Sequence, residues 1–177
     1  TGELFVVPVD DAAEAAGVLV ALVAERIPRS FGLDALRDVQ VLVPTHRGPL
    51  GAQSLNEALQ ARLNPETARG RKGLGPGDKV MQRKNDYDLD VWNGDVGTVV
   101  TADDKTVVVR IDGRDVTYVG NAADNLALAY AATVHKAQGS EYDAVVIGLH
   151  TSHFMLLNRS LLYTAITRAR RLAVIVG

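Results

Sequence analysis

The chain is predicted to be an α/β protein whose parallel sheet is interrupted by a small antiparallel β-barrel. Apolar runs of strand length alternate with amphipathic helices at both ends of the chain, which implies parallel strands joined by crossover helices. Residues 78–125 carry instead short β-rich runs and tight-turn dipeptides. We therefore place the α/β domain at 1–72 and 126–177, and the inserted barrel at 73–125.

The composition fits a globular domain with an insertion. Hydrophobic residues make up 47% of the 177 positions and charged residues 23%, which excludes a disordered chain. The absence of cysteine excludes disulfides and thiolate zinc sites. No apolar run approaches the roughly 18 residues of a membrane span, so we expect a cytoplasmic protein with no membrane partner. A net charge of −2 argues against a self-sufficient DNA-binding module, which is usually basic.

The first part of the chain alternates strand and helix. The expected elements are strands at 3–9 and 39–43 and helices at 10–27 and 52–63. Asp11 with Glu14 can form a capping box, and Pro28 is expected to follow the end of the first helix.

The inserted barrel is expected to contain four β-rich runs. These are residues 79–83, 96–101, 106–111 and 116–119. Asn93-Gly94 and Asp112-Gly113 are hairpin-turn signals. The segment is too short for a β-sandwich.

The α/β pattern then resumes. We expect it to contain an apolar run at 126–131, a helical turn at 133–138, a strand at 144–149, a helix at 159–170 and a strand at 172–176. Asn158 is the expected N-cap of the last helix.

Polar groups crowd the segment that follows the apolar run ending near residue 132. In parallel α/β sheets, ligands bind at the carboxyl ends of strands. Gly139 allows close backbone approach there, Thr133 and His135 can donate to phosphates, and Glu141 can accept from a sugar hydroxyl. The alternative is a capped turn with a satisfied histidine. We favour a ligand site because Lys136 and Gln138 add two more polar groups within nine residues.

Three arginines follow the apolar stripe of the last expected helix. Basic residues suit helix C-termini, which would account for Arg170 and Arg171. Arg168 is less well explained in this way because its neighbours on the same face are apolar. An arginine held rigidly against a core is what an arginine finger on a transferring phosphoryl group requires, a role worth roughly 10³–10⁵ in rate.

A strand-to-helix connection spans residues 41–51. Thr45, His46 and Arg47 emerge just past the carboxyl end of the strand, and the next helix would present its N-terminal amides to an anion. The alternative is an ordinary connection, and we favour a phosphate contact.

Other candidates are interpreted as structural. We assign Tyr87 and Trp92 to the barrel core rather than to base stacking. His150 and His153 could form a metal pair, but no third ligand is evident, so no metal site is predicted. The basic stretch at 62–84 is interpreted as a solvated face, with a phosphate-tracking rim as the alternative.

The sequence contains no G-x-x-x-x-G-K-[ST] loop and no evident acidic Walker B strand. The groups that hold Mg²⁺ and the β-phosphate are therefore missing. We expect the chain alone to be unable to hydrolyse ATP.

Residues 130–141 and 161–170 resemble motifs V and VI of superfamily-one helicases, in the RecD-like branch. Residues 41–51 are similar to the segment that opens the second RecA-like domain of these helicases. Residues 77–81 together with Asn93-Gly94-Asp95 look like the start of the family's inserted Src-homology-3-like barrel. The resemblance implies that the α/β domain is a RecA-like domain carrying that barrel.

The resemblance also implies a parent enzyme that couples ATP hydrolysis to 5′-to-3′ travel on single-stranded DNA. Two RecA-like domains would close on ATP and Mg²⁺, which the first domain would mainly bind. That first domain is not present here, so the chain is expected to be a fragment whose partners are single-stranded DNA and the other RecA-like domain.

Carried over by position, Arg168 would be the arginine finger, and Gln138, Gly139 and Glu141 would bind the nucleotide. The residues expected to contact DNA are Thr45, His46, Arg47, Thr133, His135 and Lys136. The competing hypothesis is a non-catalytic nucleic-acid or protein-binding module that reuses the helicase fold. Arg168 favours the helicase, whereas the missing Walker loop favours the alternative for this chain alone.

Overall fold

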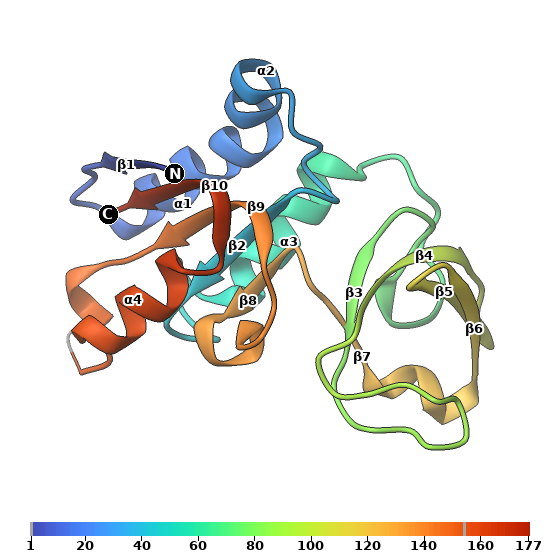
Figure 1. Ribbon diagram of the computed structural model, residues 1–177. Helices are drawn as coiled ribbons and strands as arrows, with labels where there is room; N and C mark the ends of the chain where they lie inside the picture. The colour runs from blue at the N-terminus through green and yellow to red at the C-terminus, as the bar shows by residue number, and fades with distance from the viewer. Residues whose placement is uncertain (1, 154) are drawn as a thin grey trace. The chain divides into compact units, whose positions relative to one another are not determined.

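The computed structural model describes residues 2–153 and 155–177, which form two compact units. The first unit combines the chain up to residue 63 with residues 130–177, and the second unit is residues 64–129. The first contains a parallel sheet and the second an antiparallel sheet (Figure 1). Both sheet types were predicted.

The parallel sheet has the strand order β1-β10-β9-β2-β8. Its strands are β1 (Glu3–Val7), β2 (Val39–Val43), β8 (Ala131–Thr133), β9 (Tyr142–Gly148) and β10 (Ala169–Val176). Every residue of β2 is buried, as its unbroken apolar run predicts for a strand covered on both faces.

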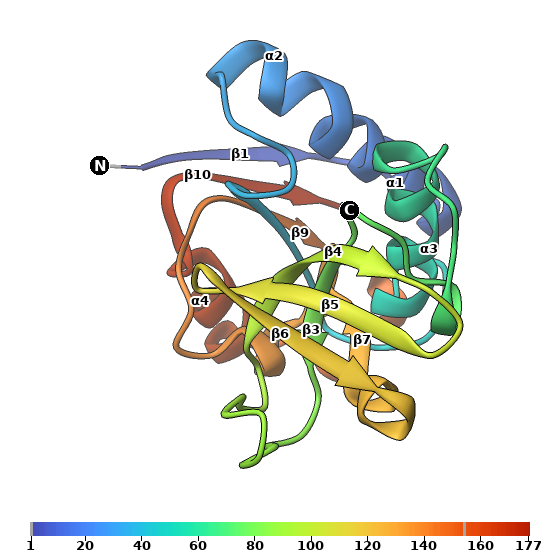
Figure 2. The same ribbon diagram turned by 90° about the vertical axis from the view of Figure 1, so that its right-hand side faces the viewer.

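Helices cover both faces of this sheet. α1 (Ala12–Ala21) and α3 (Ala52–Leu63) lie on one face, and α4 (Arg159–Ile166) lies on the other (Figures 1 and 2). The predicted N-caps are confirmed: Asp11 accepts a hydrogen bond from the amide of Glu14, and Asn158 accepts one from Leu161. No helix in the described parts of the chain is long and apolar enough to cross a bilayer.

The first helix continues further than predicted. α1 runs into a π-helical turn η1 (Leu22–Arg26) and then into α2 (Ile27–Phe31), which Gly32 ends with a φ of 64°. The expected stop before Pro28 is wrong. Pro28 lies in the first turn of α2, directly after the π-helical turn, and the helical run continues through it.

The last helix is shorter than predicted. α4 ends at Ile166 instead of residue 170, and the chain enters β10 at Ala169. Arg170 and Arg171 therefore lie on a strand, so their expected role of balancing a helix dipole is wrong. Local helix propensity is overridden by pairing of β10 with β9 and β1.

The second unit has the strand order β6-β5-β4-β3-β7, all antiparallel. Its strands are β3 (Lys79–Gln82), β4 (Val96–Ala102), β5 (Thr106–Ile111), β6 (Arg114–Val119) and β7 (Leu126–Leu128), with short 3₁₀ turns η2 (Arg71–Gly73) and η3 (Gly120–Asn125). Asp112-Gly113 forms the predicted hairpin turn, with φ values of 48° and 77°. Asn93-Gly94 is a turn near the end of the long connection between the paired strands β3 and β4, and is not the two-residue loop of a tight hairpin.

The second unit is wider than the predicted 73–125. β7 pairs with β3, so residues 126–128 belong to the barrel sheet rather than to the α/β domain. At the other boundary, Asn64 and Arg69 bind the buried carboxylate of Asp78 at 2.8 and 3.0 Å. These contacts attach residues 64–72 to the second unit as well.

Candidate functional site

Arg168 lies in the turn between α4 and β10, and its backbone is fixed on both sides. Its amide donates to the carbonyl of Ala165 at 3.2 Å, and its carbonyl accepts from the amide of Tyr142 at 2.8 Å. The half-buried guanidinium makes two long contacts, from Nη1 to the carbonyl of Ser140 at 3.4 Å and from Nη2 to the hydroxyl of Thr167 at 3.5 Å. Arg168 therefore lies against the turn that contains Gly139.

Arg168 has no carboxylate partner in the described parts of the chain, unlike its two neighbours. Arg170 Nε is 3.1 Å from Glu141 Oε2, and Arg171 Nη1 is 3.8 Å from Asp143 Oδ2. The buried Nε of Arg168 also lacks a hydrogen-bond partner among the described residues. A partly buried cation without a counter-charge favours an anionic ligand.

Tyr142 borders Arg168 without neutralising it. Burial raises the pKa of the Tyr142 phenol above its ordinary value, and this effect is partly opposed by a hydrogen bond with Ser140 and by the Arg168 cation. The phenol is therefore neutral at physiological pH and offers Arg168 no negative charge.

The other residues predicted to bind nucleotide lie near the same turn. Gly139 has a φ of 85°, a conformation that favours glycine, and the space beyond its Cα is open. Glu141 is exposed and already paired with Arg170. Gln138 shares a cavity of about 270 Å³ with His135, between the 3₁₀ turn η4 (Val134–Ala137) and the N-terminal part of α4.

The six residues predicted to contact DNA lie at or just beyond the ends of two neighbouring strands, β2 and β8. Val43, the last residue of β2, is in register with Thr133, the last residue of β8. Thr45, His46 and Arg47 follow β2, while His135 and Lys136 lie on η4 directly after β8. The sheet topology therefore brings the two segments to one edge, where the side chains of His46, Arg47, His135 and Lys136 are exposed.

The predicted anion site at the N-terminus of α3 is only partly available. The amide of Ala52 donates to the carbonyl of Thr45 at 3.1 Å, and the amide of Gln53 donates to that of His46 at 3.0 Å. A phosphate at this edge would therefore be bound by side chains rather than by these two amides. The hydroxyl of Thr45 also donates to a carbonyl, that of Arg47 at 3.0 Å.

The polar residues of the segment after β8 were expected together at the carboxyl edge of the sheet, whereas the structure separates Thr133 from Gly139 and Glu141. Thr133 is level with the last residue of β2, whereas Ala144 in β9 is level with Val39, the first residue of β2. Because β9 is parallel to β2, the chain must return to the amino edge of the sheet, where β2 begins, before β9 can start. Gly139 and Glu141 consequently lie at the amino edge with Arg168, and Thr133 lies at the opposite edge.

Comparison with protein families divides the chain in a similar way. Residues 128–176 match the UvrD-like helicase C-terminal domain, and residues 55–112 match the SH3 domain of ATP-dependent RecD-like DNA helicases. The ATP-dependent RecD2 DNA helicase of Deinococcus radiodurans is 47% identical over 135 residues, which are 75% of this chain and 19% of that protein. The RecBCD enzyme subunit RecD of Mycolicibacterium smegmatis is 34% identical over 82% of this chain and 26% of that subunit.

This chain belongs to the RecD-like helicase family. It spans about a fifth to a quarter of the length of these RecD-like relatives. Among solved structures, the Pif1 helicase from Bacteroides in complex with ADP-AlF3 and single-stranded DNA aligns with a TM-score of 0.58 at 19% identity, over 89% of this chain and 44% of that one. That similarity establishes the shared fold.

The basic stretch of the RecD-like chain is largely paired within the protein. Arg62 contacts Glu25, Arg69 contacts Asp78, and Arg71 contacts Asp124 at 3.1 Å. The alternative of a phosphate-tracking rim at 62–84 is therefore not favoured, because these guanidinium groups already have carboxylate partners.

The structure also places the two remaining pairs of candidate residues in the RecD-like chain. Tyr87 and Trp92 are 76% and 45% exposed, so their assignment to the barrel core is wrong. His150 binds the carbonyl of Asp10 at 3.0 Å and the hydroxyl of Ser152 at 2.8 Å. Among the described residues, no cluster of three or more His, Cys, Asp or Glu is placed to hold a metal.

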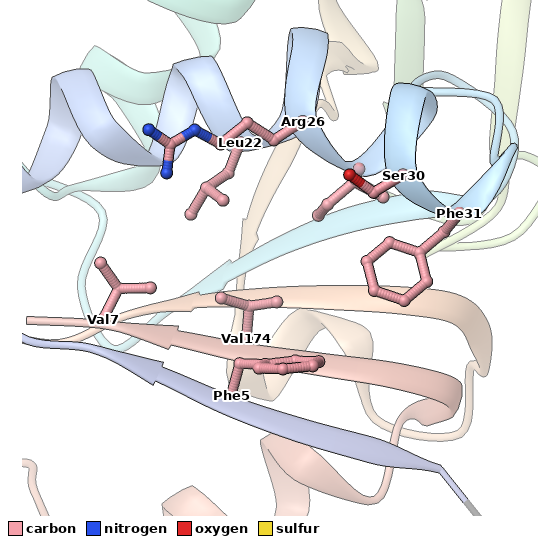
Figure 3. Close-up of a pocket in the computed structure, with 8 residues that line it drawn as sticks. Phe5, Val7, Leu22, Arg26, Ser30, Phe31 and Val174 are labelled. Carbon is pink, nitrogen blue, oxygen red and sulfur yellow. The ribbon is translucent and has the colours of Figure 1, made fainter.

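An apolar cavity of about 320 Å³ lies away from these RecD-like site residues. It is bounded by β1, β10 and the helical segment from η1 to α2 (Figure 3). The rings of Phe5 and Phe31 meet there edge to face, with centroids 6.4 Å apart. None of the residues predicted to bind nucleotide or DNA lines this cavity.

Proposed function

We propose that this chain is the second RecA-like domain of an ATP-dependent 5′-to-3′ DNA helicase, and that Arg168 is its arginine finger. The observation that carries the proposal is a guanidinium held at a glycine turn without a carboxylate partner in the described parts of the chain. Membership of the RecD-like family supplies the reaction class. The other RecA-like domain of the parent protein would supply the opposite wall of the nucleotide site.

The side chains present fit a polyphosphate better than they fit a metal. Arg168 offers an uncompensated positive charge, while no metal-binding cluster is found among the described residues. Mg²⁺ and most of the nucleotide would therefore be held by the other RecA-like domain. When bound, ATP supplies the phosphoryl group that is transferred to water. This chain alone would not hydrolyse ATP.

Arg168 would act by stabilising charge. Its backbone is anchored through Ala165 and Tyr142, so little backbone conformational entropy remains to be lost when an anion arrives. A guanidinium can direct several N–H donors at phosphoryl oxygens, and in a site closed from water such donors are strongest. The neutral phenol of Tyr142 leaves that charge intact.

The carboxyl edge of β2 and β8 would form part of the single-stranded DNA track. His46, Arg47, His135 and Lys136 are exposed there, and Thr45 and Thr133 are half-buried. These groups suit contacts to phosphates, which position a nucleic acid without reading its sequence.

Replacing Arg168 in the parent helicase tests the nucleotide role. Arg168→Ala is expected to lower the DNA-stimulated kcat for ATP hydrolysis by about 10³-fold, with a much smaller change in KM. Arg171→Ala is the matched control because Arg171 is exposed and pairs with Asp143, a residue with no assigned role at the site, and it should remain within a fewfold of wild type. An Arg168→Ala enzyme that also stays within a fewfold would refute the assignment.

The DNA role is tested by the same assay at varied DNA concentration. The double variant His46→Ala/His135→Ala is expected to raise the concentration of single-stranded DNA that gives half-maximal stimulation, while kcat at saturating DNA is preserved. An unchanged half-maximal concentration would show that this edge lies outside the DNA track.

The competing function is a non-catalytic binding module. The ion pair between Glu141 and Arg170 favours it, because Glu141 is then less available to a nucleotide. A parent protein that binds DNA but shows no ATPase activity, with an intact first domain, would support this second function.

A further inference from the structure

Tyr87 and Trp92 form an exposed aromatic pair on the second unit. Their ring centroids are 5.4 Å apart with an angle of 80° between the planes, and 76% of Tyr87 and 45% of Trp92 are exposed. Tyrosine and tryptophan are the residues most enriched at the energetic centres of protein interfaces. Two such rings exposed together therefore indicate a surface that binds something.

The backbone that carries the two rings is fixed. Asp86 and Val91 exchange backbone hydrogen bonds of 2.8 and 3.0 Å, and each aromatic residue directly follows one member of this bridge. Val91 is fully buried in the core of the unit, and the amide of Trp92 donates to Asp95 Oδ2 at 2.8 Å. The exposure of the rings is thus imposed by a rigid support.

The turn between Asp86 and Val91 is also attached to the sheet. Arg114 on β6 donates to the carbonyl of Leu89 at 3.1 Å and to that of Asp90 at 2.6 Å, and Leu89 packs against the core. A surface held in this way loses little entropy on binding, which is the property of a preorganised docking site.

The charge of the segment selects the partner. Residues 85–95 contain four aspartates and neither lysine nor arginine, although Arg83 and Lys84 precede them. Asp88 is exposed, and the side chain of Asp90 is 75% exposed, with its Oδ2 3.9 Å from Arg114 Nη2. A nucleic acid whose bases stacked on these rings would bring its phosphates close to several carboxylates. A cationic side chain is attracted both by aromatic ring faces and by the carboxylates beside them.

We propose that the surface formed by Tyr87, Asp88, Asp90 and Trp92 docks a basic segment of a partner protein, with an arginine or lysine side chain packed on Trp92. This role goes beyond the helicase reaction, because none of the residues assigned to nucleotide or DNA lies in this unit.

The proposal is testable by fluorescence because Trp92 is the single tryptophan of the chain. The 177-residue chain would be titrated with a short peptide of alternating glycine and arginine, and with the same peptide carrying citrulline, a neutral isostere of arginine. The arginine peptide is expected to change Trp92 emission saturably and the citrulline peptide to leave it unchanged. Tyr87→Ala and Asp88→Asn should each weaken binding about threefold or more.

Tyr163→Ala is the matched control, since Tyr163 is 72% exposed but belongs to the other unit, and it should leave the affinity unchanged. Three results would overturn the proposal. These are equal binding of the arginine and citrulline peptides, unchanged affinity in both Tyr87→Ala and Asp88→Asn, or a saturable response to single-stranded oligothymidine where the arginine peptide gives none. The last result would assign the pair to base stacking.

Discussion

Arg168, Arg170 and Arg171 occupy four consecutive positions with one alanine, yet their environments differ. Arg170 and Arg171 join β10 to β9 through Glu141 and Asp143, whereas Arg168 keeps an uncompensated charge among the described residues. The sequence singled out Arg168 because its neighbours are apolar. It misassigned the other two because their carboxylate partners are about thirty positions away, and only strand pairing brings them together.

Tyr118 gives a residue-scale prediction for stability at alkaline pH. Burial, aided by the carboxylates of Asp86 and Asp95, raises the pKa of Tyr118 to about 12 from its ordinary value of 10. The folded state therefore holds this proton more tightly than the unfolded chain does. The resulting stabilisation is complete below pH 10 and is lost as the pH rises towards about 12.

Tyr118→Phe should remove this loss. The hydroxyl is buried without a hydrogen-bond partner in the described residues, so the variant is expected to be at least as stable as wild type at pH 7. Urea unfolding, followed by the fluorescence of Trp92 in the same unit, gives the free energy of unfolding of wild type and variant at pH 7 and at pH 11. A steeper alkaline loss in the variant than in wild type would contradict the prediction.

At the scale of elements, local signals predicted some boundaries and missed others. The helix at 52–63 has the expected bounds because leucines spaced four apart end at Asn64-Pro65. β7 and β8 were merged at 126–131 because the apolar run is continuous there, although the two strands belong to different sheets. The six DNA-contact candidates were brought to one edge by the predicted parallel topology, whereas the return of the chain to the amino edge at Gly139 depends on tertiary structure.

Asn56 on α3 fixes the edge strand that carries Thr133. Its Nδ2 donates to the carbonyl of Ala131 at 2.9 Å, and its Oδ1 accepts from the amide of Ala131 at 2.8 Å. Asn56→Ala would leave both backbone groups buried without partners, so we expect a loss of about 2–4 kcal/mol in the free energy of unfolding.

Gln53→Ala is the matched control, because Gln53 is exposed on the same helix and alanine is a good helix former. Chemical denaturation followed by circular dichroism measures both variants. Equal stability of Asn56→Ala and Gln53→Ala would show that the two hydrogen bonds do not hold β8 in place.

At the scale of the whole chain, the second unit is an insertion between α3 and β8. Each unit has its own sheet, and the second has its own core built around Tyr118, Val107 and Leu126. The two boundaries were predicted only approximately, because the contacts that set them are hydrogen bonds between residues distant in sequence.

Two deletions distinguish the observed boundaries from the predicted ones. Removal of 64–129, with a flexible linker in its place, is expected to leave the parallel sheet folded with a cooperative thermal transition. Removal of 73–125 should give a less stable and aggregation-prone product, because β7 loses its partner β3 and Arg69 loses Asp78. Calorimetry compares the thermal transitions of the two variants, and light scattering compares their aggregation. Equal transitions and equal aggregation would contradict these boundaries.

The most direct test of Arg168 as the arginine finger is a structure of the parent helicase bound to ADP and a fluoride mimic of the transferring phosphoryl group. We expect the guanidinium of Arg168 to lie within hydrogen-bond distance of the mimic, while Arg170 remains paired with Glu141. A mimic contacted by Arg170 or Arg171, with Arg168 still directed only at Ser140 and Thr167, would contradict this assignment.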